Sequence, residues 1–377
     1  MKFKTLDDFN FLGKKVLVRS DLNSEVNKGK VVLGERIIES AKTIAELKKK
    51  GARVVVLSHQ GRPEKKDFTS LEQHANLLGK YTKIRFVKGI LGKNAIEEIR
   101  NLKNGEAILL DNIRKLKEEF NPGRDNLIVK VLGKEFDYYV NDSFSVSHRN
   151  QASVVGFPKV LRSCIGRLMQ KEIESLNKVR TRKGLFILGG NKPEDNILLM
   201  NKGRVATCGT FGELCLMAKG YNLGAKSKVL GKDRGVLEKI KKSVLGVRTP
   251  IDLAVSVKGK RKEISLDELP SKYMSYDIGS RTIKLYSQLI KEADAIFMKG
   301  PAGMFETKGF DKGTKEILEA ISKTKGFSVL GGGNLNSALS KFKINKNRFG
   351  YVSLSGGATI YYLAGMKLPG LEALKGK

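Results

Sequence analysis

The chain has 377 residues, 40% of them hydrophobic, and a formal net charge of +32 at pH 7. This length exceeds what one hydrophobic core usually supports, so we expect two domains. No segment reaches the ~18 consecutive apolar residues of a membrane-spanning helix, and the first residues lack the apolar stretch of a signal peptide, so we expect a cytoplasmic protein without a membrane partner.

Cysteine and histidine are both scarce. The three cysteines are too few and too scattered for a disulfide framework or a zinc motif, and the three histidines lie in segments that serve different elements. These residues are Cys164, Cys208, Cys215, His59, His74 and His148. We therefore expect reduced thiols and no metal centre built by the protein itself.

The positive charge is compatible with a nucleic-acid binder, a membrane-surface protein or an enzyme that handles polyanions. Lysines cluster at positions 48–50 and again at Lys239, Lys241 and Lys242, where we expect helices. No aromatic residues alternate with them to stack on bases, so the pattern favours solvated helix faces over a nucleic-acid stripe.

Short apolar runs alternate with amphipathic stretches along almost the whole chain, which favours parallel sheets covered by helices in both halves. We expect strands at residues 16–18, 54–57, 107–110 and 138–140. Between the first two, Ile37, Ala41, Ile44 and Ala45 recur at helical spacing, and Gly51 is suited to end that helix. The first half is predicted to be an α/β domain.

In the first half, polar residues follow the expected strands. They are Asp21, Asn23, Arg36, His59, Arg62, Arg114 and Arg149. If the strands lie side by side, these residues meet at one edge and form a pocket for a small molecule with phosphate and carboxylate groups. The alternative is that each arginine is an unrelated surface residue, which for any one of them is at least as good an interpretation.

In the second half, strands that mostly end in glycine precede helices. The segments are LFILGG, RVATCG, IDLAVS, AIFMKGP, FSVLGGG and YVSLSGG. Without a Cβ, glycine lets backbone N–H groups approach an anion, and a following helix directs its positive end there, which suits phosphate. Neither a P-loop motif nor a strand followed by G-x-G-x-x-G is present, so a nucleotide must be held differently.

Several motifs lie in order along the chain. V-R-x-D-x-N appears at 18–23, S-H-x-G-R-P at 58–63, L-L-E-N-x-R with Asp111 for the glutamate, and Y-V-N-D-x-F followed by H-R from Tyr139 to Arg149. G-P-x-G-x-F-E at 300–306, GGG at 331–333 and LPG at 368–370 complete the set. From about residue 14 to 371 the chain resembles phosphoglycerate kinases, and EDN after GGNKP and the short AKGYNLG segment are more like archaeal members.

This resemblance implies an α/β protein of two Rossmann-like three-layer α/β/α domains, with mainly parallel sheets, a hinge helix and a cleft between the lobes. Residues 1–165 would form the phosphoglycerate-binding domain, joined by the C-terminal tail at about 358–377. Residues 166–179 would form the interdomain helix, and 180–357 the nucleotide-binding domain. The implied reaction is reversible phosphoryl transfer between 1,3-bisphosphoglycerate plus ADP and 3-phosphoglycerate plus ATP in glycolysis and gluconeogenesis, in line and after domain closure.

The resemblance also implies roles for single residues. The seven polar residues of the first half would hold phosphoglycerate, and catalysis would depend on Arg36, Lys192, Gly332 and Gly333. The nucleotide, with its bound Mg²⁺, would contact Gly190, Asn191, Lys192, Gly209, Lys299, Pro301, Glu306, Gly332, Gly333, Asn334 and Leu335. Lys192 would touch the transferring phosphoryl group and Glu306 the ribose, and a monomer is expected.

The nucleotide half departs from the common family pattern at several positions. Asn196 stands where many members have a second lysine, Lys299 replaces the asparagine of N-G-P, and Asn334 and Leu335 replace the Asp-Thr after GGG. A strand end expected as GGG reads Thr-Cys-Gly at 207–209. We hypothesise that Lys299 supplies positive charge near the phosphates, so that Mg²⁺ is held mainly by the nucleotide's own oxygens; an exposed lysine on a loop is the equally good alternative.

Two other functions are compatible with the sequence. A phosphoglycerate-binding homologue with impaired nucleotide chemistry would explain the altered second half, although Lys192, Glu306 and the glycine turns argue against it. A nucleic-acid-binding role rests on charge alone, and such binding would weaken steeply with salt.

Overall fold

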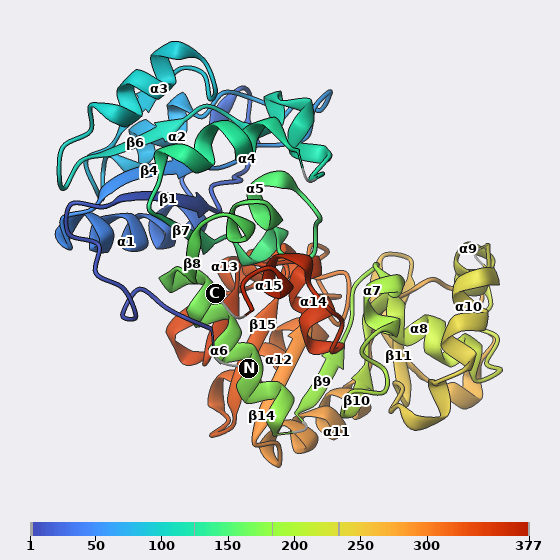
Figure 1. Ribbon diagram of the computed structural model, residues 1–377. Helices are drawn as coiled ribbons and strands as arrows, with labels where there is room; N and C mark the ends of the chain where they lie inside the picture. The colour runs from blue at the N-terminus through green and yellow to red at the C-terminus, as the bar shows by residue number, and fades with distance from the viewer. Residues whose placement is uncertain (1–2, 124, 183, 233, 376–377) are drawn as a thin grey trace. The chain divides into compact units, whose positions relative to one another are not determined.

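The computed structural model describes residues 3–123, 125–182, 184–232 and 234–375, and these form two compact units. Unit 1 comprises the chain up to Ile173 together with the residues from Lys367 onward, and unit 2 runs from Glu174 to Met366. Figure 1 shows the elements of both, coloured along the chain. The first division falls within α6 (Arg167–Thr181), where the sequence predicts an interdomain helix at 166–179. The second follows residue 366, whereas the C-terminal tail is predicted from about 358, because α14 (Gly357–Leu363) packs within unit 2.

Unit 1 is built on a sheet of six parallel strands in the order β5-β6-β4-β1-β7-β8. In Figure 1 the labels β6, β4, β1, β7 and β8 follow one another across the sheet. The four predicted strands of this half are confirmed in β1, β4, β6 and β7. The strands are β1 Lys15–Ser20, β4 Arg53–Leu57, β5 Arg85–Val87, β6 Ala107–Leu110, β7 Tyr138–Asp142 and β8 Arg162–Ile165, with a small antiparallel pair, β2 Val26–Asn27 and β3 Lys30–Val31.

Helices cover this sheet through apolar faces. The predicted helix is α1, Glu35–Lys49, whose Ile37, Ala41, Ile44 and Leu47 are buried. It ends before Gly51, whose φ is +76°. With the buried strands, these residues form the core of unit 1. The other helices of this unit are α2 Glu72–Leu78, α3 Lys93–Arg100, α4 Leu127–Leu132, α5 Ala152–Val155 and α15 Pro369–Glu372.

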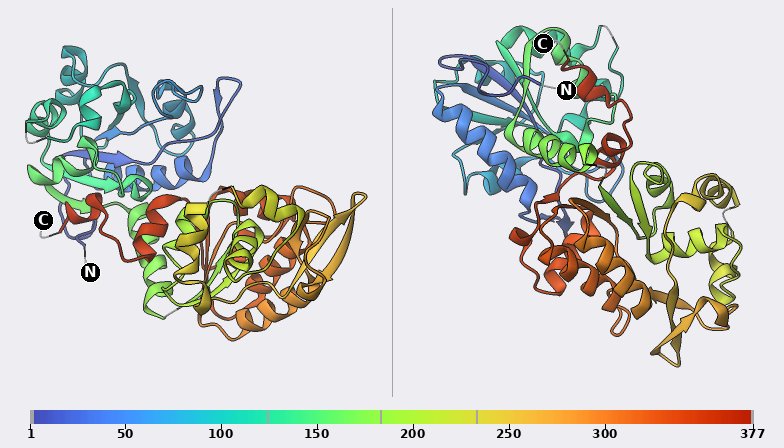
Figure 2. Two further views of the ribbon diagram at one scale, coloured as in Figure 1. Left: turned by 90° about the vertical axis from the view of Figure 1, so that its right-hand side faces the viewer. Right: turned by 90° about the horizontal axis from the view of Figure 1, so that it is seen from below.

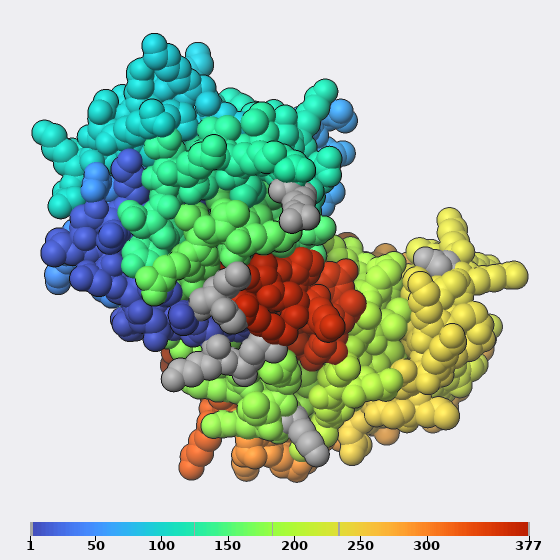
Figure 3. Space-filling view, in the orientation of Figure 1, coloured from blue at the N-terminus to red at the C-terminus, as the bar shows by residue number. Residues whose placement is uncertain are grey.

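The C-terminal segment packs within unit 1. The N–H of Gly370 donates to the carbonyl of Ser147 at 2.9 Å, and Ala373 packs against the buried Val146 and Val154. Figure 3 shows the C-terminal residues in red beside the green residues around 150. The end of the chain therefore supports the loop and helix that follow β7.

Unit 2 contains a second parallel sheet, of five strands in the order β10-β9-β14-β15-β16. The strands are β9 Leu185–Leu188, β10 Arg204–Thr207, β14 Ala295–Lys299, β15 Phe327–Gly331 and β16 Tyr351–Ser353. β9 pairs with β10 on one side and with β14 on the other. The strand order thus reverses between β9 and β14, which is where open α/β sheets bind ligands beyond their carboxyl ends.

The segment IDLAVS differs from the other apolar runs. It forms β11, Asp252–Val257, which pairs antiparallel with β12, Lys260–Ser265, and with β13, Ser275–Ile278. The expectation that it joins the parallel sheet is wrong, because an apolar run of this length fits either kind of sheet and the pairing partner decides. Figure 2 shows the β11–β12 hairpin, in yellow to orange, at one end of unit 2.

The helices of unit 2 bury their apolar faces against the parallel sheet or the smaller antiparallel one. They are α7 Pro193–Ile197, α8 Gly209–Ala218, α9 Ala225–Leu230, α10 Arg234–Lys241, α11 Ser280–Lys291, α12 Lys312–Lys323, α13 Gly333–Lys341 and α14. Two α/β units with mainly parallel sheets are therefore present, as the sequence predicts. Among the described residues no helix combines the length and apolar character needed to cross a membrane.

Candidate functional site

The predicted polar residues of unit 1 come together at the carboxyl edge of its sheet. Asp21 follows β1, His59 follows β4, Arg114 follows β6 and Arg149 follows β7. These strands are neighbours and parallel, so their carboxyl ends share one edge. We call Arg19, Arg36, His59, Arg62, Arg114 and Arg149 the basic cluster.

Arg19 lies at the centre of the basic cluster and is fully buried. Its Nη2 lies 3.1 Å from Nδ1 of His59, and its Nε donates to Oγ of Ser153 at 2.9 Å. Ser153 Oγ in turn donates to Oε1 of the buried Glu119 at 2.7 Å. The chain of contacts from Glu119 to Arg19 thus holds the imidazole of His59 in place.

The positive groups of the cluster disfavour one another's charge. Burial lowers the pKa of His59 well below its usual value, and Arg19, Arg114, Arg149 and Arg36 lower it further. Burial likewise lowers the pKa of Arg114 to about 9, with Arg149 and Arg19 adding to the effect. His59 is therefore neutral at pH 7, and an anion that bound here would relieve the repulsion among the guanidinium groups.

Arg114 has hydrogen-bond donors without acceptors. Its Nη1 donates to the carbonyl of Gly61, whereas Nε and Nη2 are buried without a hydrogen-bond partner among the described residues. An unsatisfied buried donor costs about 1–3 kcal/mol, so two of them on one guanidinium require an explanation. Two adjacent N–H groups in a fork match the oxygens of a phosphate or a carboxylate.

The remaining predicted residues fix the loop beyond β1. Nε of Arg36 lies 3.3 Å from Oδ2 of Asp21, and its Nη1 donates to the carbonyl of Asn23 at 2.8 Å. The side chain of Asn23 accepts from the N–H of Gly61 at 2.8 Å, which ties this loop to the one after β4. Asp21 thus partly offsets the positive charge and orients Arg36.

In unit 2, backbones approach closely where the strand order reverses. The N–H of Gly189 donates to the carbonyl of Lys299 at 2.7 Å, and that of Gly190 to the carbonyl of Pro301 at 3.0 Å. A Cβ on Gly189 would lie 2.4 Å from the Pro301 oxygen, and one on Gly300 would lie 2.5 Å from the Gly189 oxygen. Glycine is required here by close approach as well as by the positive φ of Gly190 and Gly300.

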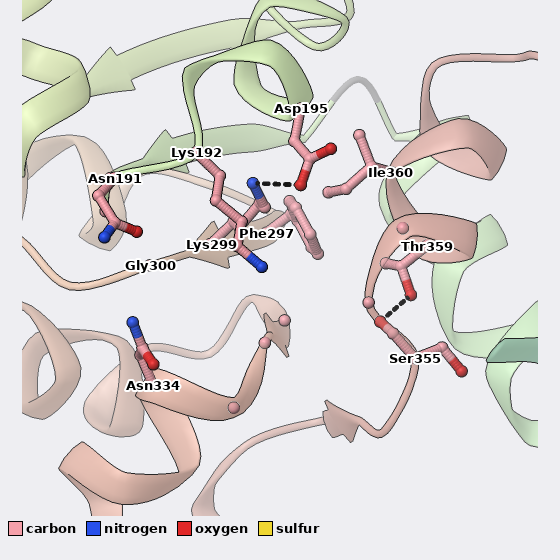
Figure 4. Close-up of a pocket in the computed structure, with 17 residues that line it drawn as sticks. Asn191, Lys192, Asp195, Phe297, Lys299, Gly300, Asn334, Ser355, Thr359 and Ile360 are labelled. Carbon is pink, nitrogen blue, oxygen red and sulfur yellow. Dashed lines mark hydrogen bonds and ion pairs between the residues drawn. The ribbon is translucent and has the colours of Figure 1, made fainter. Parts of the chain in front are cut away.

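These turns line a cavity at the ends of β9, β14, β15 and β16, which we call the phosphate pocket. Figure 4 shows Asn191, Lys192 and Lys299 on one side and Asn334, Ser355 and Thr359 on others. Gly332 and Gly333 line it too, and α13 begins at Gly333, so the free N–H groups of this helix start at the pocket wall.

Lys299 is not an exposed loop lysine. It ends β14 with only 14% of its side chain exposed, and its Nζ lies 3.2 Å from Oδ2 of Asp195 and 3.1 Å from Oδ1 of Asn196. Burial lowers its pKa, while Asp195 opposes and Lys192 adds to that effect. The ammonium is therefore held beside the phosphate pocket, close to Lys192.

A second cavity, which we call the base pocket, adjoins the first and shares Gly190, Asn191 and Asn334 with it. The predicted residues Gly209, Pro301 and Glu306 line this second cavity. The side chain of Leu335 lines neither cavity, because it is fully buried in the core of unit 2, and the predicted nucleotide contact of this residue stays a prediction.

Metal ligands are sparse. In the part of the chain that the structure describes, no three histidine, cysteine, aspartate or glutamate side chains gather as a metal site requires. Asp195 is the carboxylate that lines the phosphate pocket, and it is paired with Lys299. A pocket with a single carboxylate suits a cation whose other oxygen ligands come from the bound nucleotide and water.

Three features of the two sites are missing from the sequence prediction. Arg19 is named there only as part of a motif, yet it orders His59. Ser355 and Thr359 follow β16 and line the phosphate pocket. The sequence predicts a strand end in the segment YVSLSGG but no role for these two residues. Glu213 and Lys226 line the base pocket, and no motif marks them, because helix residues far from strand ends carry no local signal.

The chain is similar to proteins of one family over nearly its whole length. A family model described as "Phosphoglycerate kinase" matches residues 6–366. Among curated proteins, phosphoglycerate kinase of Methanothermus fervidus is 37% identical, with 99% of this chain and 97% of the relative aligned. That of Methanococcus maripaludis is 39% identical, with 99% and 98% aligned.

Solved structures agree. The crystal structure of phosphoglycerate kinase from Pyrococcus horikoshii OT3 is similar with a TM-score of 0.87 and 36% identity, covering 98% of each chain. The structure of phosphoglycerate kinase from Coxiella burnetii is similar with a TM-score of 0.85 and 30% identity, covering 99% of each. Sequence and fold therefore point to the same family.

Proposed function

The chain belongs to the phosphoglycerate kinase family and is accordingly a kinase, and we propose that it transfers a phosphoryl group reversibly between 1,3-bisphosphoglycerate plus ADP and 3-phosphoglycerate plus ATP, in glycolysis and gluconeogenesis. The observation that carries this proposal is that one chain contains both a buried basic cluster, in unit 1, and a glycine-lined phosphate pocket, in unit 2. Each suits one of the two substrates. The reading as a binding protein without nucleotide chemistry is not favoured by full-length similarity to kinases.

The basic cluster is proposed to hold 3-phosphoglycerate. Two unpaired donors on Arg114 and the neighbouring charges of Arg62 and Arg149 fit a phosphate. Arg36, oriented by Asp21, would stand near the substrate carboxylate that receives the phosphoryl group. His59 is neutral and can donate or accept one hydrogen bond as the substrate hydroxyl requires.

The pockets of unit 2 are proposed to hold MgATP or MgADP. Backbone N–H groups at Gly332 and Gly333, with Lys192 and Lys299, would stabilise negative charge on the oxygens of the transferring group. Mg²⁺ would be held mainly by the nucleotide's phosphate oxygens, with Asp195 near enough to contribute, and would neutralise phosphate charge when bound. Glu306 would bind the ribose from the base pocket.

A coupled assay tests the proposal. Purified protein receives 3-phosphoglycerate and MgATP, together with a dehydrogenase that consumes 1,3-bisphosphoglycerate, and turnover is compared among wild type, Lys192→Ala and Arg36→Ala. Turnover in the wild type that falls sharply in both variants is expected. No turnover by folded wild type, with 3-phosphoglycerate still binding in calorimetry, would instead favour a binding protein. Domain closure, a cytoplasmic location and a monomeric state stay predictions from the sequence.

A further inference from the structure

The base pocket is lined by both apolar and charged side chains. Leu253, Tyr276, Pro301 and Met304 line its sides and offer surfaces for a flat ring. Glu213 on α8 and Lys226 on α9 line the same cavity, although only 6% and 11% of their side chains are exposed. A pocket that needed only to bury an apolar ring would not require two opposite charges.

Ser275 contacts both Glu213 and Lys226. Nζ of Lys226 lies 3.1 Å from Oε2 of Glu213 and donates to the carbonyl of Ser275 at 2.9 Å. The hydroxyl of Ser275 donates to Oε1 of Glu213 at 2.5 Å. An ammonium has three N–H donors, and these two partners account for at most two of them. Lys226 Nζ also lies 5.5 Å from the centre of the Tyr276 ring.

We infer that Lys226, positioned by Glu213 and Ser275, donates a hydrogen bond to an acceptor on the purine ring of the bound nucleotide. The inference rests on the proposed function, because it assigns the base of the same nucleotide to this cavity. Purine rings carry acceptor nitrogens on their edges, and a ring lying between Tyr276 and Met304 could present one edge to Lys226. Glu213 is a positioning residue, since its Oε1 is occupied and its Oε2 is buried.

The pair is poorly explained by stability alone. Removing two charges from water is costly, and well-packed apolar residues in place of a buried ion pair are often as stable or more so. An apolar trio would join α8, α9 and β13 equally well. The ion pair, with Ser275, adds a donor of fixed direction to a cavity that also has apolar walls, which is how small-molecule sites fix a ligand's orientation.

Calorimetry with two ligands separates base recognition from general charge. MgADP and magnesium pyrophosphate are each titrated into wild type, Lys226→Met, the neutral double variant Glu213→Gln/Lys226→Met, and Lys228→Met. Lys228 is an exposed lysine on the same helix and serves as the matched control. The double variant guards against misfolding in Lys226→Met, where Glu213 would lose its counter-charge, and thermal unfolding verifies that each variant is folded.

We expect ADP affinity to fall about tenfold in both Lys226 variants, while pyrophosphate affinity stays within about twofold and Lys228→Met matches wild type. Equal weakening of ADP and pyrophosphate would overturn the inference, because Lys226 would then act on the phosphates. Unchanged ADP affinity in the folded double variant would also overturn it and leave the pair a structural feature. Both results leave the proposed function intact, whereas wild type that binds neither ligand would overturn the proposed function itself.

Discussion

Lys299 and Asn196 lie in contact although 103 positions separate them: Nζ of the lysine donates to Oδ1 of the asparagine at 3.1 Å. Asn196 is fully buried and its Nδ2 donates to the carbonyl of Gly189 at 2.9 Å. In the common family pattern the lysine stands at position 196 and the asparagine at 299. The two residue types are therefore exchanged across a contact, so that the positive charge stays beside the phosphate pocket while its point of attachment moves from α7 to the end of β14.

Replacing Lys299 by methionine should lower kcat by at least about tenfold, because a largely buried cation beside the phosphate pocket would stabilise charge that develops on the transferring phosphoryl group. The coupled assay measures it. Lys308→Met removes an exposed charge from the same unit and should leave kcat unchanged. Full turnover in Lys299→Met would reject the role of this lysine.

The exchange itself supplies a second test. In the double variant Asn196→Lys/Lys299→Asn the charge returns to position 196, and kcat should recover to within about tenfold of wild type from the lower value of Lys299→Met. Recovery would show that the pocket needs the charge more than its attachment point. A double variant slower than Lys299→Met would show instead that position 299 itself is required.

The basic cluster was the most predictable part of the two sites. Asp21, His59, Arg114 and Arg149 each follow a strand recognisable from its apolar run, and parallel strands bring their carboxyl ends to one edge. Once the order of the strands is known, these four residues are expected to lie at the same edge of the sheet. The buried path from Glu119 through Ser153 to Arg19 could not be foreseen, because it depends on side-chain directions across three separate segments.

Chain direction and helix rotation were harder to predict. Leu335 follows the glycines of the phosphate pocket in sequence and lies in the first turn of α13, whose rotation turns its side chain into the core, so only its backbone can face the pocket. IDLAVS has the composition of a parallel strand, but its pairing with the β12 hairpin makes it antiparallel. The contact between Lys299 and Asn196 required knowing that β9 and β14 are neighbours.

Arg114→Met should separate binding from stability. Loss of a charge-assisted hydrogen bond should weaken 3-phosphoglycerate binding by at least about tenfold, measured by calorimetry. Without ligand, the variant should gain about 1 kcal/mol in free energy of unfolding, because it removes two unsatisfied donors and repulsion from Arg149 and Arg19. Arg85→Met, at an exposed ion pair with Glu98, should change neither quantity appreciably. A loss of stability in Arg114→Met would contradict the assignment of these donors to a ligand.

Gly333→Ala tests whether backbone approach at the start of α13 serves the nucleotide. A Cβ on Gly333 meets no atom within 4 Å, so the folded protein should tolerate it with an unchanged Tm. Because Gly333 lines the phosphate pocket, the added methyl group should keep phosphate oxygens from the N–H groups and weaken MgADP binding about tenfold. Gly246→Ala, also in open space but on the exposed surface of the same unit, is the control. Wild-type ADP affinity in Gly333→Ala would exclude close phosphate contact there.

Asp142 should make the stability of unit 1 depend on pH. This residue ends β7, and its Oδ1 accepts from the N–H of Met169 at 3.1 Å, while its buried Oδ2 has no hydrogen-bond partner among the described residues. Burial raises the pKa of the carboxyl from 3.8 to about 7, and the donors that favour the charged form do not compensate. The folded chain therefore holds this proton more tightly than the unfolded chain does.

A raised pKa in the folded state contributes stability that is complete below about pH 4 and is lost as the pH rises through about 7. The wild type should accordingly lose about 2–3 kcal/mol of unfolding free energy between pH 5 and pH 8 through this group, measured by urea denaturation with a probe in unit 1. Asp142→Asn cannot titrate and should lose that much less over the same interval, whereas Glu64→Gln, at an exposed position of unit 1, should retain the wild-type difference. Equal pH dependence in wild type and Asp142→Asn would mean that the proton leaves Asp142 at an ordinary pKa, and that the side chain of Thr43 and the N–H donors of α6 together outweigh the cost of burying its charge.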